Sequence, residues 1–301
     1  MRILNFGSLN IDHVFDVTRI VRPGETIASH GYRTFAGGKG ANQSFALARA
    51  GAAVCHAGRV GADGRWLCEK LAAVGVDVSP VVVDDAHSTG QAIIQVDAAG
   101  ENAIVLHAGT NHRIDRDQIE RTLADFSDGD VLLLQNEVSH MAEMIDAGRR
   151  RGMTVVFNPA PMTEAVHDYP LEQVDVLIVN ESESRALSGR DDARAILEMR
   201  PAGQTVVLTL GAAGVCCRGG DGRLVEAASP RVEPVDTTAA GDTFIGYFLA
   251  SWTAGGKLDA SLSRACRAAA LCCTRPGAMD AIPTATEVDA FPLNARKGND
   301  E

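Results

Sequence analysis

Four short apolar runs in the middle of the chain decide its fold, and they read Val131-Leu-Leu-Leu134, Thr154-Val-Val-Phe157, Val176-Leu-Ile-Val179 and Val206-Val-Leu-Thr-Leu210. Runs that are apolar almost throughout are typical of strands buried on both faces of a sheet. Segments with helical periodicity precede or separate them, at 117–126 and 142–151. Strand and helix in alternation imply right-handed crossovers, and therefore a mostly parallel central sheet with helices on both faces. The sequence predicts the α/β class.

Two segments depart from this rhythm, at about 12–35 and 88–108, where apolar and polar residues alternate. The turn Asp97-Ala-Ala-Gly100 is expected to join 92–96 to 103–107 as an antiparallel hairpin. We expect these strands to form a small β-sheet lid, inserted into a single α/β domain that spans residues 1–301. The polar tail at 294–301 is expected to fray.

Composition excludes several classes of protein. No stretch approaches the roughly 18 apolar residues of a membrane span, and residues 1–9 lack the features of a secretory signal, so we expect a cytoplasmic protein with no membrane partner. The net charge is -11 and no basic run interrupts it, which disfavours nucleic acid as a partner. The seven cysteines have neither C-x-x-C nor zinc-ligand spacing and are expected to be reduced core thiols.

A glycine-rich segment, Gly37-Gly-Lys-Gly-Ala-Asn-Gln43, precedes an apolar helical run at 45–50. This pattern predicts a turn that contacts a ligand and leads into the N-terminus of a helix. Spacing excludes two familiar phosphate loops, because a P-loop would need glycine at Arg33, and a dinucleotide fingerprint would need glycine at Gln43. A plain helix start after a flexible turn remains the alternative.

The segment Asp236-Thr-Thr-Ala-Ala-Gly-Asp242-Thr-Phe is more specific. Small residues at Ala239, Ala240 and Gly241 allow a ligand to approach the backbone, and the helical run at 243–253 places their N–H groups at a helix N-terminus, where an anion is favoured. The same amides should keep the Asp242 carboxylate ionised, within reach of a hydroxyl that attacks the phosphate. Alternatively, Asp242 is only the N-cap of that helix.

Together, these two motifs resemble the two signatures of the ribokinase family of carbohydrate kinases. The resemblance extends from Ile3 to about Phe291 and includes Gly7-Ser-Leu-Asn-Ile-Asp12, Pro23-Gly-Glu-Thr26, His107-Ala-Gly109, Asn158-Pro-Ala-Pro161, Asn180-Glu-Ser-Glu183 and Thr209-Leu-Gly211. There are two departures. Many relatives have glycine where Ala239 stands, and relatives usually have a second glycine where Trp66 stands, a change that could alter packing beneath the sugar site.

The resemblance implies transfer of the γ-phosphate of ATP to a sugar hydroxyl, with Asp242 as the catalytic base and the amides of Ala239, Ala240 and Gly241 as an anion hole. It implies that Asn180 and Glu183 help to hold Mg²⁺ through water. The implied nucleotide site contains Asn180, Thr209, Gly211, Gly214, Gly241 and, at the adenine, Cys266. An implied site for a monovalent cation, K⁺, uses Asp236 and Thr238 with the carbonyls of Cys272, Arg275 and Gly277. Without the resemblance, Glu183 is a carboxylate on a helix face and Asp236 is a turn residue.

The sugar site implied by the resemblance contains Asn10, Asp12, Gly38, Lys39, Asn42, Glu137 and Asp242. It favours D-ribose, phosphorylated at its 5-hydroxyl. Fructose, a deoxyribose, a nucleoside or a sugar phosphate are alternative acceptors, and a catalytically silent sensor is a different class of protein. Glu137 near the anomeric hydroxyl disfavours a nucleoside, and Asp242 with Glu183 disfavours a sensor. Relatives often pair two lids, so a homodimer is expected.

Overall fold

The computed structural model describes residues 1–292, so the tail expected to fray at 294–301 lies outside the described residues. Its main feature is a nine-stranded sheet with the order β13-β12-β11-β10-β9-β8-β1-β4-β5. The strands are β1 (Ile3–Phe6), β4 (Val54–Gly61), β5 (Val81–Asp84), β8 (Val131–Gln135), β9 (Thr154–Asn158), β10 (Val176–Asn180), β11 (Thr205–Thr209), β12 (Val215–Arg218) and β13 (Leu224–Ala227).

The four apolar runs are the neighbouring parallel strands β8 to β11, which confirms the α/β prediction. Strand β11 ends at Thr209, so Leu210 lies just beyond it. The sequence did not indicate that β12 and β13 complete one edge of the sheet in antiparallel orientation.

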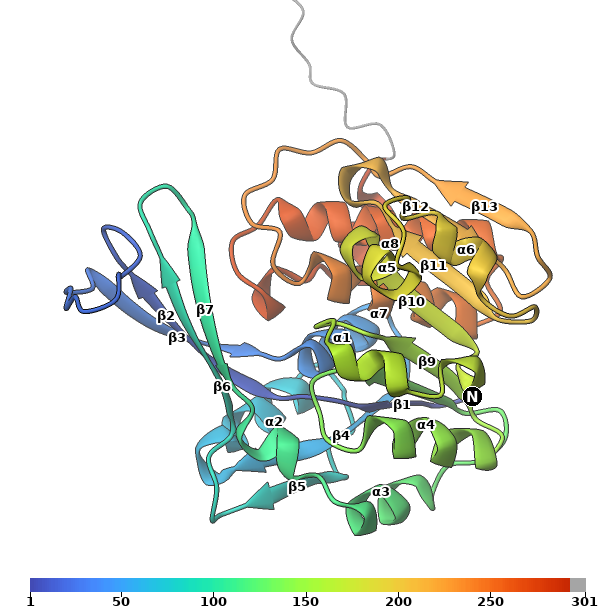
Figure 1. The fold of residues 1–301 in the computed structure, drawn as a ribbon, viewed down its shortest axis with the longest axis horizontal. Coiled ribbons are helices and arrows are strands. Elements are labelled where there is room, and N and C mark those ends of the chain that lie inside the picture. Colours follow the sequence, from blue (N-terminus) through green and yellow to red (C-terminus); the bar gives the residue numbers. More distant parts are fainter. Residues whose placement is uncertain (293–301) are drawn as a thin grey trace, which may run out of the picture.

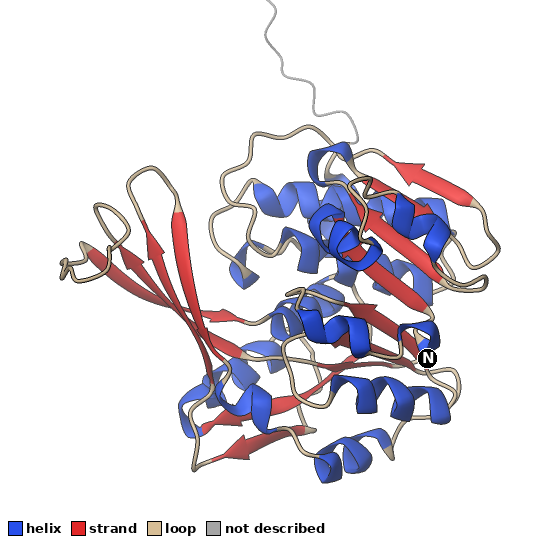
Figure 2. Ribbon diagram, viewed as in Figure 1, coloured by secondary structure: helices blue, strands red, loops and turns tan. Residues whose placement is uncertain are grey.

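Helices cover both faces of this sheet because its strands are apolar on both sides (Figures 1 and 2). Along β8, Leu133 faces one core and Leu132 and Leu134 face the other. The first core packs against α1 (Lys39–Arg49), α2 (Arg65–Ala72), α7 (Ala240–Thr253), α8 (Leu258–Cys273) and α9 (Ala285–Ala290). The second packs against α3 (Arg116–Leu123), α4 (Met141–Arg150), α5 (Glu181–Ser188) and α6 (Ala195–Met199). The expected helices at 117–126 and 142–151 are α3 and α4.

A second sheet projects from the main body on one side (Figures 1 and 2). Its order is β3-β2-β6-β7, with β2 (Asn10–Asp16), β3 (Gly31–Gly37), β6 (Gly90–Val96) and β7 (Asn102–His107). The expected hairpin is present, since β6 and β7 pair antiparallel and the Gly100 N–H donates to the Asp97 carbonyl at 3.0 Å. Asn10 lies at the base of this sheet, in register with Gly37 and Gly90.

All seven cysteines are free thiols, five of them buried and two partly buried, as expected for core residues. Across residues 1–292, no helix is both long and apolar enough to cross a membrane. Trp66 lies in α2 and packs against the first core, and nothing in the structure explains why it replaces glycine.

Candidate active site

A cavity of about 360 Å³ lies where the carboxyl ends of β9, β10 and β11 meet the N-terminus of α7. The ends of parallel strands and the start of a helix are where α/β proteins commonly bind ligands. Lys39 from the glycine-rich motif and Gly241 and Asp242 from the second motif line this cavity. Asn180, Glu183 and Thr209, from the ends of β10 and β11 and the start of α5, also line it. The fold therefore brings together two segments that are distant in the sequence.

Asp242 is the third residue of α7, whose N-cap is Ala239, so the interpretation of Asp242 as a simple N-cap is wrong. Its side chain is buried, with 7% of its surface exposed. Asn42 Nδ2 donates to Asp242 Oδ2 at 3.1 Å, and Gln43 Nε2 donates to Oδ1 at 2.9 Å. We expected the backbone amides of α7 to hold this carboxylate. The structure shows that side-chain amides from α1 do so instead.

The first turn of α7 presents free backbone donors. The N–H groups of Gly241 and Asp242 have no acceptor among the described residues, as is usual for the first turn of a helix. In contrast, the Ala240 N–H is 3.2 Å from the Thr237 carbonyl and is already engaged. Ala239 has φ 61°, in the left-handed region where only glycine is free of steric cost. This conformation explains why many relatives have glycine at this position. Of the three amides expected to form the anion hole, those of Ala239 and Gly241 thus have no acceptor within residues 1–292, whereas that of Ala240 has one.

The glycine-rich turn is shorter than expected, because α1 begins at Lys39 and not near Phe45. Only Gly38 needs a special backbone conformation, with φ 91°. Glu137 links this turn to Ser8. Its Oε2 accepts hydrogen bonds from the Ser8 hydroxyl and, at 2.9 Å, from the Lys39 N–H. The alternative prediction, a plain helix start after a flexible turn, is thus partly correct, although the helix begins inside the motif.

Negative charge dominates the region around Lys39. The carboxylates of Asp242, Glu137 and Glu183 raise the pKa of the Lys39 ammonium, with Asp242 having the largest effect, and Lys39 is therefore charged at neutral pH. Burial raises the pKa of both Glu137 and Glu183. Burial, together with repulsion from Glu137, raises the pKa of Asp12 to about 7. A site with one lysine and this many carboxylates favours a bound cation.

Asp12 and Asn10 lie at the base of the small sheet. A Cβ at position 37 would overlap the Asp12 carboxylate, so glycine at 37 is what allows the close approach of this side chain. Within residues 1–292, no hydrogen-bond donor reaches the Asp12 carboxylate. Asn10 Oδ1 accepts a hydrogen bond from buried Asn111 Nδ2 at 2.7 Å, which fixes the Asn10 side chain.

Glu183 is more than a carboxylate on a helix face, because it is 6% exposed and completes a capping box at the start of α5. Its two oxygens accept hydrogen bonds from Asn180, from the backbone N–H at 3.0 Å and from Nδ2 at 2.9 Å. Each oxygen keeps a second lone pair for another donor or for a cation.

A second, more apolar cavity of about 470 Å³ adjoins the first and shares Thr209, Thr237 and Gly241 with it. It is lined by Thr209, Gly211, Gly214 and Cys266, which were expected to form the nucleotide site. Asn180, also expected there, lines the first cavity instead. Burial raises the pKa of the Cys266 thiol to about 12, so it contributes a neutral surface.

Asp236 forms a turn that joins two loops. Its Oδ1 accepts from the Thr238 N–H at 2.8 Å, and its Oδ2 accepts from the Gly277 N–H at 2.9 Å. Burial alone would raise the pKa of Asp236, but these hydrogen bonds outweigh burial and lower it. Asp236 is therefore a turn residue. Of the other residues in the cation hypothesis, Gly277 contacts Asp236 directly, whereas the Cys272 thiol lies against the Thr238 carbonyl and the Cys272 carbonyl accepts from the Arg275 N–H at 3.1 Å.

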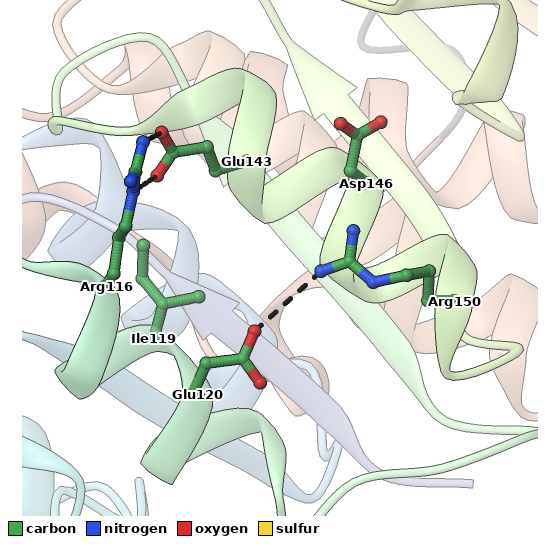
Figure 3. Close-up of a pocket in the computed structure, with 6 residues that line it drawn as sticks. All are labelled: Arg116, Ile119, Glu120, Glu143, Asp146 and Arg150. Atoms are coloured by element: carbon green, nitrogen blue, oxygen red, sulfur yellow. Dashed lines mark hydrogen bonds and ion pairs between the residues drawn. The ribbon is translucent and has the colours of Figure 1, made fainter.

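A third hollow lies apart from these cavities, between α3 and α4 (Figure 3). Its charged groups pair with one another, Arg116 with Glu143 at 2.6 Å and Arg150 with Glu120 at 3.7 Å. Because these arginines are already neutralised, the hollow offers little to attract an anionic ligand.

Sequence reasoning missed several buried polar residues around Asp242, namely Asn5, Gln43, Gln135 and Asn158. A signal was present, because Asn5 and Gln135 lie in strands that are otherwise apolar. A buried polar side chain in such a strand needs a partner and indicates a hydrogen-bond network.

Residues 2–285 match the pfkB family of carbohydrate kinases. The chain belongs to this family. A ribokinase of Haemophilus influenzae is 35% identical to this chain over 297 residues, which cover 95% of this chain and 96% of the relative. The structure of a ribokinase from Cryptococcus neoformans in complex with ADP matches with a TM-score of 0.84 and 36% identity, covering 96% of this chain and 98% of the other.

The structure of Arabidopsis thaliana ribokinase complexed with ribose and ATP matches the kinase with a TM-score of 0.85 at 27% identity, over 96% of this chain and 97% of the other. These matches confirm the expected family and fold. The kinase is a phosphotransferase that uses an alcohol group as acceptor.

Proposed function

We propose that this kinase transfers the γ-phosphoryl group of ATP to the 5-hydroxyl of D-ribose, giving ribose 5-phosphate and ADP. The observation that carries the proposal is the position of Asp242, a buried carboxylate beside the free N–H groups of α7 at the junction of two cavities. The ribokinases among the similar proteins support ribose as the acceptor.

The proposed reaction assigns a task to each group at this junction. The ribose 5-oxygen attacks the γ-phosphorus, the bond from phosphorus to the bridging oxygen breaks, and ADP leaves. The proton of the hydroxyl passes to the Asp242 carboxylate late in the reaction, because the transition state of phosphoryl transfer is loose. The Gly241 and Asp242 N–H groups stabilise the charge on the transferred phosphoryl, at the positive end of α7.

Mg²⁺ fits the chemistry of the first cavity. Glu183 is held in place by Asn180, keeps free lone pairs and is surrounded by other carboxylates. We propose that it holds the ion through water, as expected of a cation that dehydrates reluctantly. When bound with the nucleotide, Mg²⁺ supplies positive charge to the phosphates. The apolar second cavity, with Cys266 in its wall, is the proposed place for adenine.

The small sheet is proposed to act as a lid that closes over the sugar and excludes water, which would suppress hydrolysis of ATP. Its edge strand β7 exposes Ile104, Val105 and Leu106, with 52%, 67% and 57% of their surfaces accessible. Exposed apolar edge strands are usually covered. We propose that a second copy of the lid covers them in a homodimer, in the cytoplasm.

One experiment tests the proposed function as a whole. Release of ADP is measured with a coupled assay across ribose, 2-deoxyribose, fructose, nucleosides and sugar phosphates. Ribose should give the highest kcat/KM. A higher value for fructose or for a nucleoside would contradict the choice of substrate but not the kinase activity, whereas no ADP release with any acceptor would support a silent sensor.

We expect ribose to exceed 2-deoxyribose by at least about tenfold in kcat/KM. A half-buried carboxylate such as Asp12, placed to accept two hydrogen bonds from adjacent hydroxyls, loses about 1–3 kcal/mol when one hydroxyl is missing. Steady-state kinetics with both sugars provide the measurement. In Asp12→Ala the ribose KM should rise and the preference should shrink, and an unchanged KM would remove Asp12 from the sugar site.

Because the pKa of Asp12 is raised, we expect kcat/KM for ribose to depend on pH. Because its pKa is about 7 in the free protein, the carboxylate gains a proton as the pH falls below 7 and loses part of its capacity to accept hydrogen bonds. The kcat/KM for ribose should therefore fall on the acid side of pH 7. Asp12→Asn should remove that limb of the profile.

Activity should rise when K⁺ replaces tetramethylammonium at constant ionic strength. Asp236 ties its own loop to Gly277 next to the start of α7, so a cation bound there would fix the geometry of the anion site. The ADP-release assay, repeated with each cation, measures the effect. Asp236→Ala should abolish it, and equal activity with both cations would exclude the site.

A further inference from the structure

A chain of buried polar side chains runs from the backbone of α1 to the Asp242 carboxylate, and the proposed reaction does not use it. Its members come from β1, α1, β4 and β8, and none of them has any exposed surface: Asn5, Gln43, Ser44, His56 and Gln135. Buried polar groups of this kind are retained at a cost in desolvation, so their arrangement calls for an explanation.

The direction of the hydrogen bonds from Asn5 to Asp242 is fixed by the Gly40 carbonyl at the far end. The Gly40 carbonyl can only accept, so Asn5 must turn its Nδ2 toward it, at 2.8 Å. Asn5 Oδ1 then faces Gln135 and accepts from its Nε2 at 2.9 Å. Gln135 Nε2 has a second hydrogen, which it donates to Gln43 Oε1 at 2.7 Å.

Gln43 is therefore left with only one orientation, in which its Nε2 faces Asp242. This group donates to Asp242 Oδ1 at 2.9 Å and, more weakly, to Asn158 Oδ1 at 3.4 Å. Asn158 is itself oriented by the Ile178 carbonyl, which accepts from its Nδ2 at 3.0 Å. Two independent backbone carbonyls, of Gly40 and Ile178, thus dictate that an N–H points at Asp242.

The other end of the chain cannot supply a proton. Ser44 Oγ accepts from Asn5 Nδ2 at 2.8 Å and lies 2.8 Å from His56 Nδ1. Burial lowers the pKa of His56 to about 3, so its ring is neutral at any pH at which the enzyme would work. The chain is consequently a fixed line of neutral dipoles, not a proton wire.

We propose that Gln43 is a positioning residue for the catalytic base: the chain from Asn5 through Gln135 holds the Gln43 amide so that Asp242 Oδ1 accepts a hydrogen bond from it, which aims the remaining lone pairs of Asp242 at the sugar hydroxyl. This inference rests on the proposed function, because it takes Asp242 to be the base. It extends that function to a residue that touches neither the sugar nor the nucleotide.

The test is Gln43→Glu, which keeps the shape of the side chain but replaces the donor with an acceptor. Two carboxyl groups would then face each other across the same gap and share a proton, so kcat should fall at least about tenfold at pH 7 and recover toward the wild-type value by about pH 9. The profile is measured as kcat at saturating ribose and ATP, where the titration of Asp12 in the free protein does not contribute. A Gln43→Glu profile that superimposes on that of the wild type would overturn the proposal.

A second variant keeps the proposal testable if Gln43→Glu does not fold. Gln43→Met has similar volume and no donor. It should lower kcat at least about tenfold while the ribose KM stays within about twofold, because Asp242 loses one of its two donors and no residue of the proposed sugar site is changed. An unchanged kcat in this variant would also overturn the proposal. Gln135→Leu, one step further along the chain, should show a smaller loss of kcat.

A matched control separates positioning from general damage to the core. Gln204 is buried, donates to the carbonyls of Leu171 and Val174, and lies just before β11, at the opposite end from Thr209. Gln204→Glu should leave the pH profile of kcat unchanged. Asp242→Asn distinguishes the two hypotheses, since an active Asp242→Asn would refute the proposed base, whereas an inactive one with a normal Gln43→Glu would refute only the positioning role.

Discussion

Asp242→Asn should lower kcat by at least about 100-fold while ribose and ATP still bind. The substitution removes the group that accepts the proton of the sugar hydroxyl but keeps the size of the side chain. Turnover is measured by ADP release, and binding of each substrate is measured separately by calorimetry. Near-wild-type turnover would contradict the assignment of the base.

The same substitution should also reduce stability, because both oxygens of Asp242 accept hydrogen bonds from amide donors. An asparagine has one oxygen and one NH₂ group, so one donor would face another. An unsatisfied buried polar group costs about 1–3 kcal/mol, which should appear as a lower melting temperature. Substrate binding therefore serves as the control that shows the variant is folded at the assay temperature.

Gly241→Ala should lower kcat/KM for ATP by about 100-fold, the scale on which loss of a single donor affects anion stabilisation. No described atom lies within 4 Å of a Cβ placed at this position, so nothing in the protein requires glycine there. The added methyl group would instead stand beside the free N–H groups, at the junction of the two cavities. Kinetics with ATP as the varied substrate measure the effect.

Stability should not fall in Gly241→Ala, because replacing glycine by alanine in a helix stabilises it by roughly 0.5–1 kcal/mol. Gly246 in the same helix is the matched control. A Cβ at 246 would overlap Ala46 of α1, so Gly246→Ala should lower the free energy of unfolding by about 1–3 kcal/mol. If Gly241→Ala were fully active, the anion site could not include Gly241.

Much of the fold was accessible from local patterns. Continuous apolar runs predicted β8 to β11 because a strand buried on both faces has no polar side, and the alternation with Asp97 to Gly100 predicted the β6–β7 hairpin. Strand and turn patterns of this kind are local, so they can be recognised in the sequence alone. Thr209, Gly211 and Gly214, which the family resemblance implied for the nucleotide site, also line one cavity.

The class of fold, the family and the two motifs that meet at Asp242 could all be predicted from the sequence. The groups that hold the Asp242 carboxylate became visible only in the folded chain, since its donors Asn42 and Gln43 lie about 200 residues away in α1. The folded chain also shows that the Ala240 N–H is engaged by Thr237 and that Gln43 is oriented through Gln135. These features depend on the register and depth at which helices pack on the sheet, and no short stretch of sequence encodes contacts between segments so far apart.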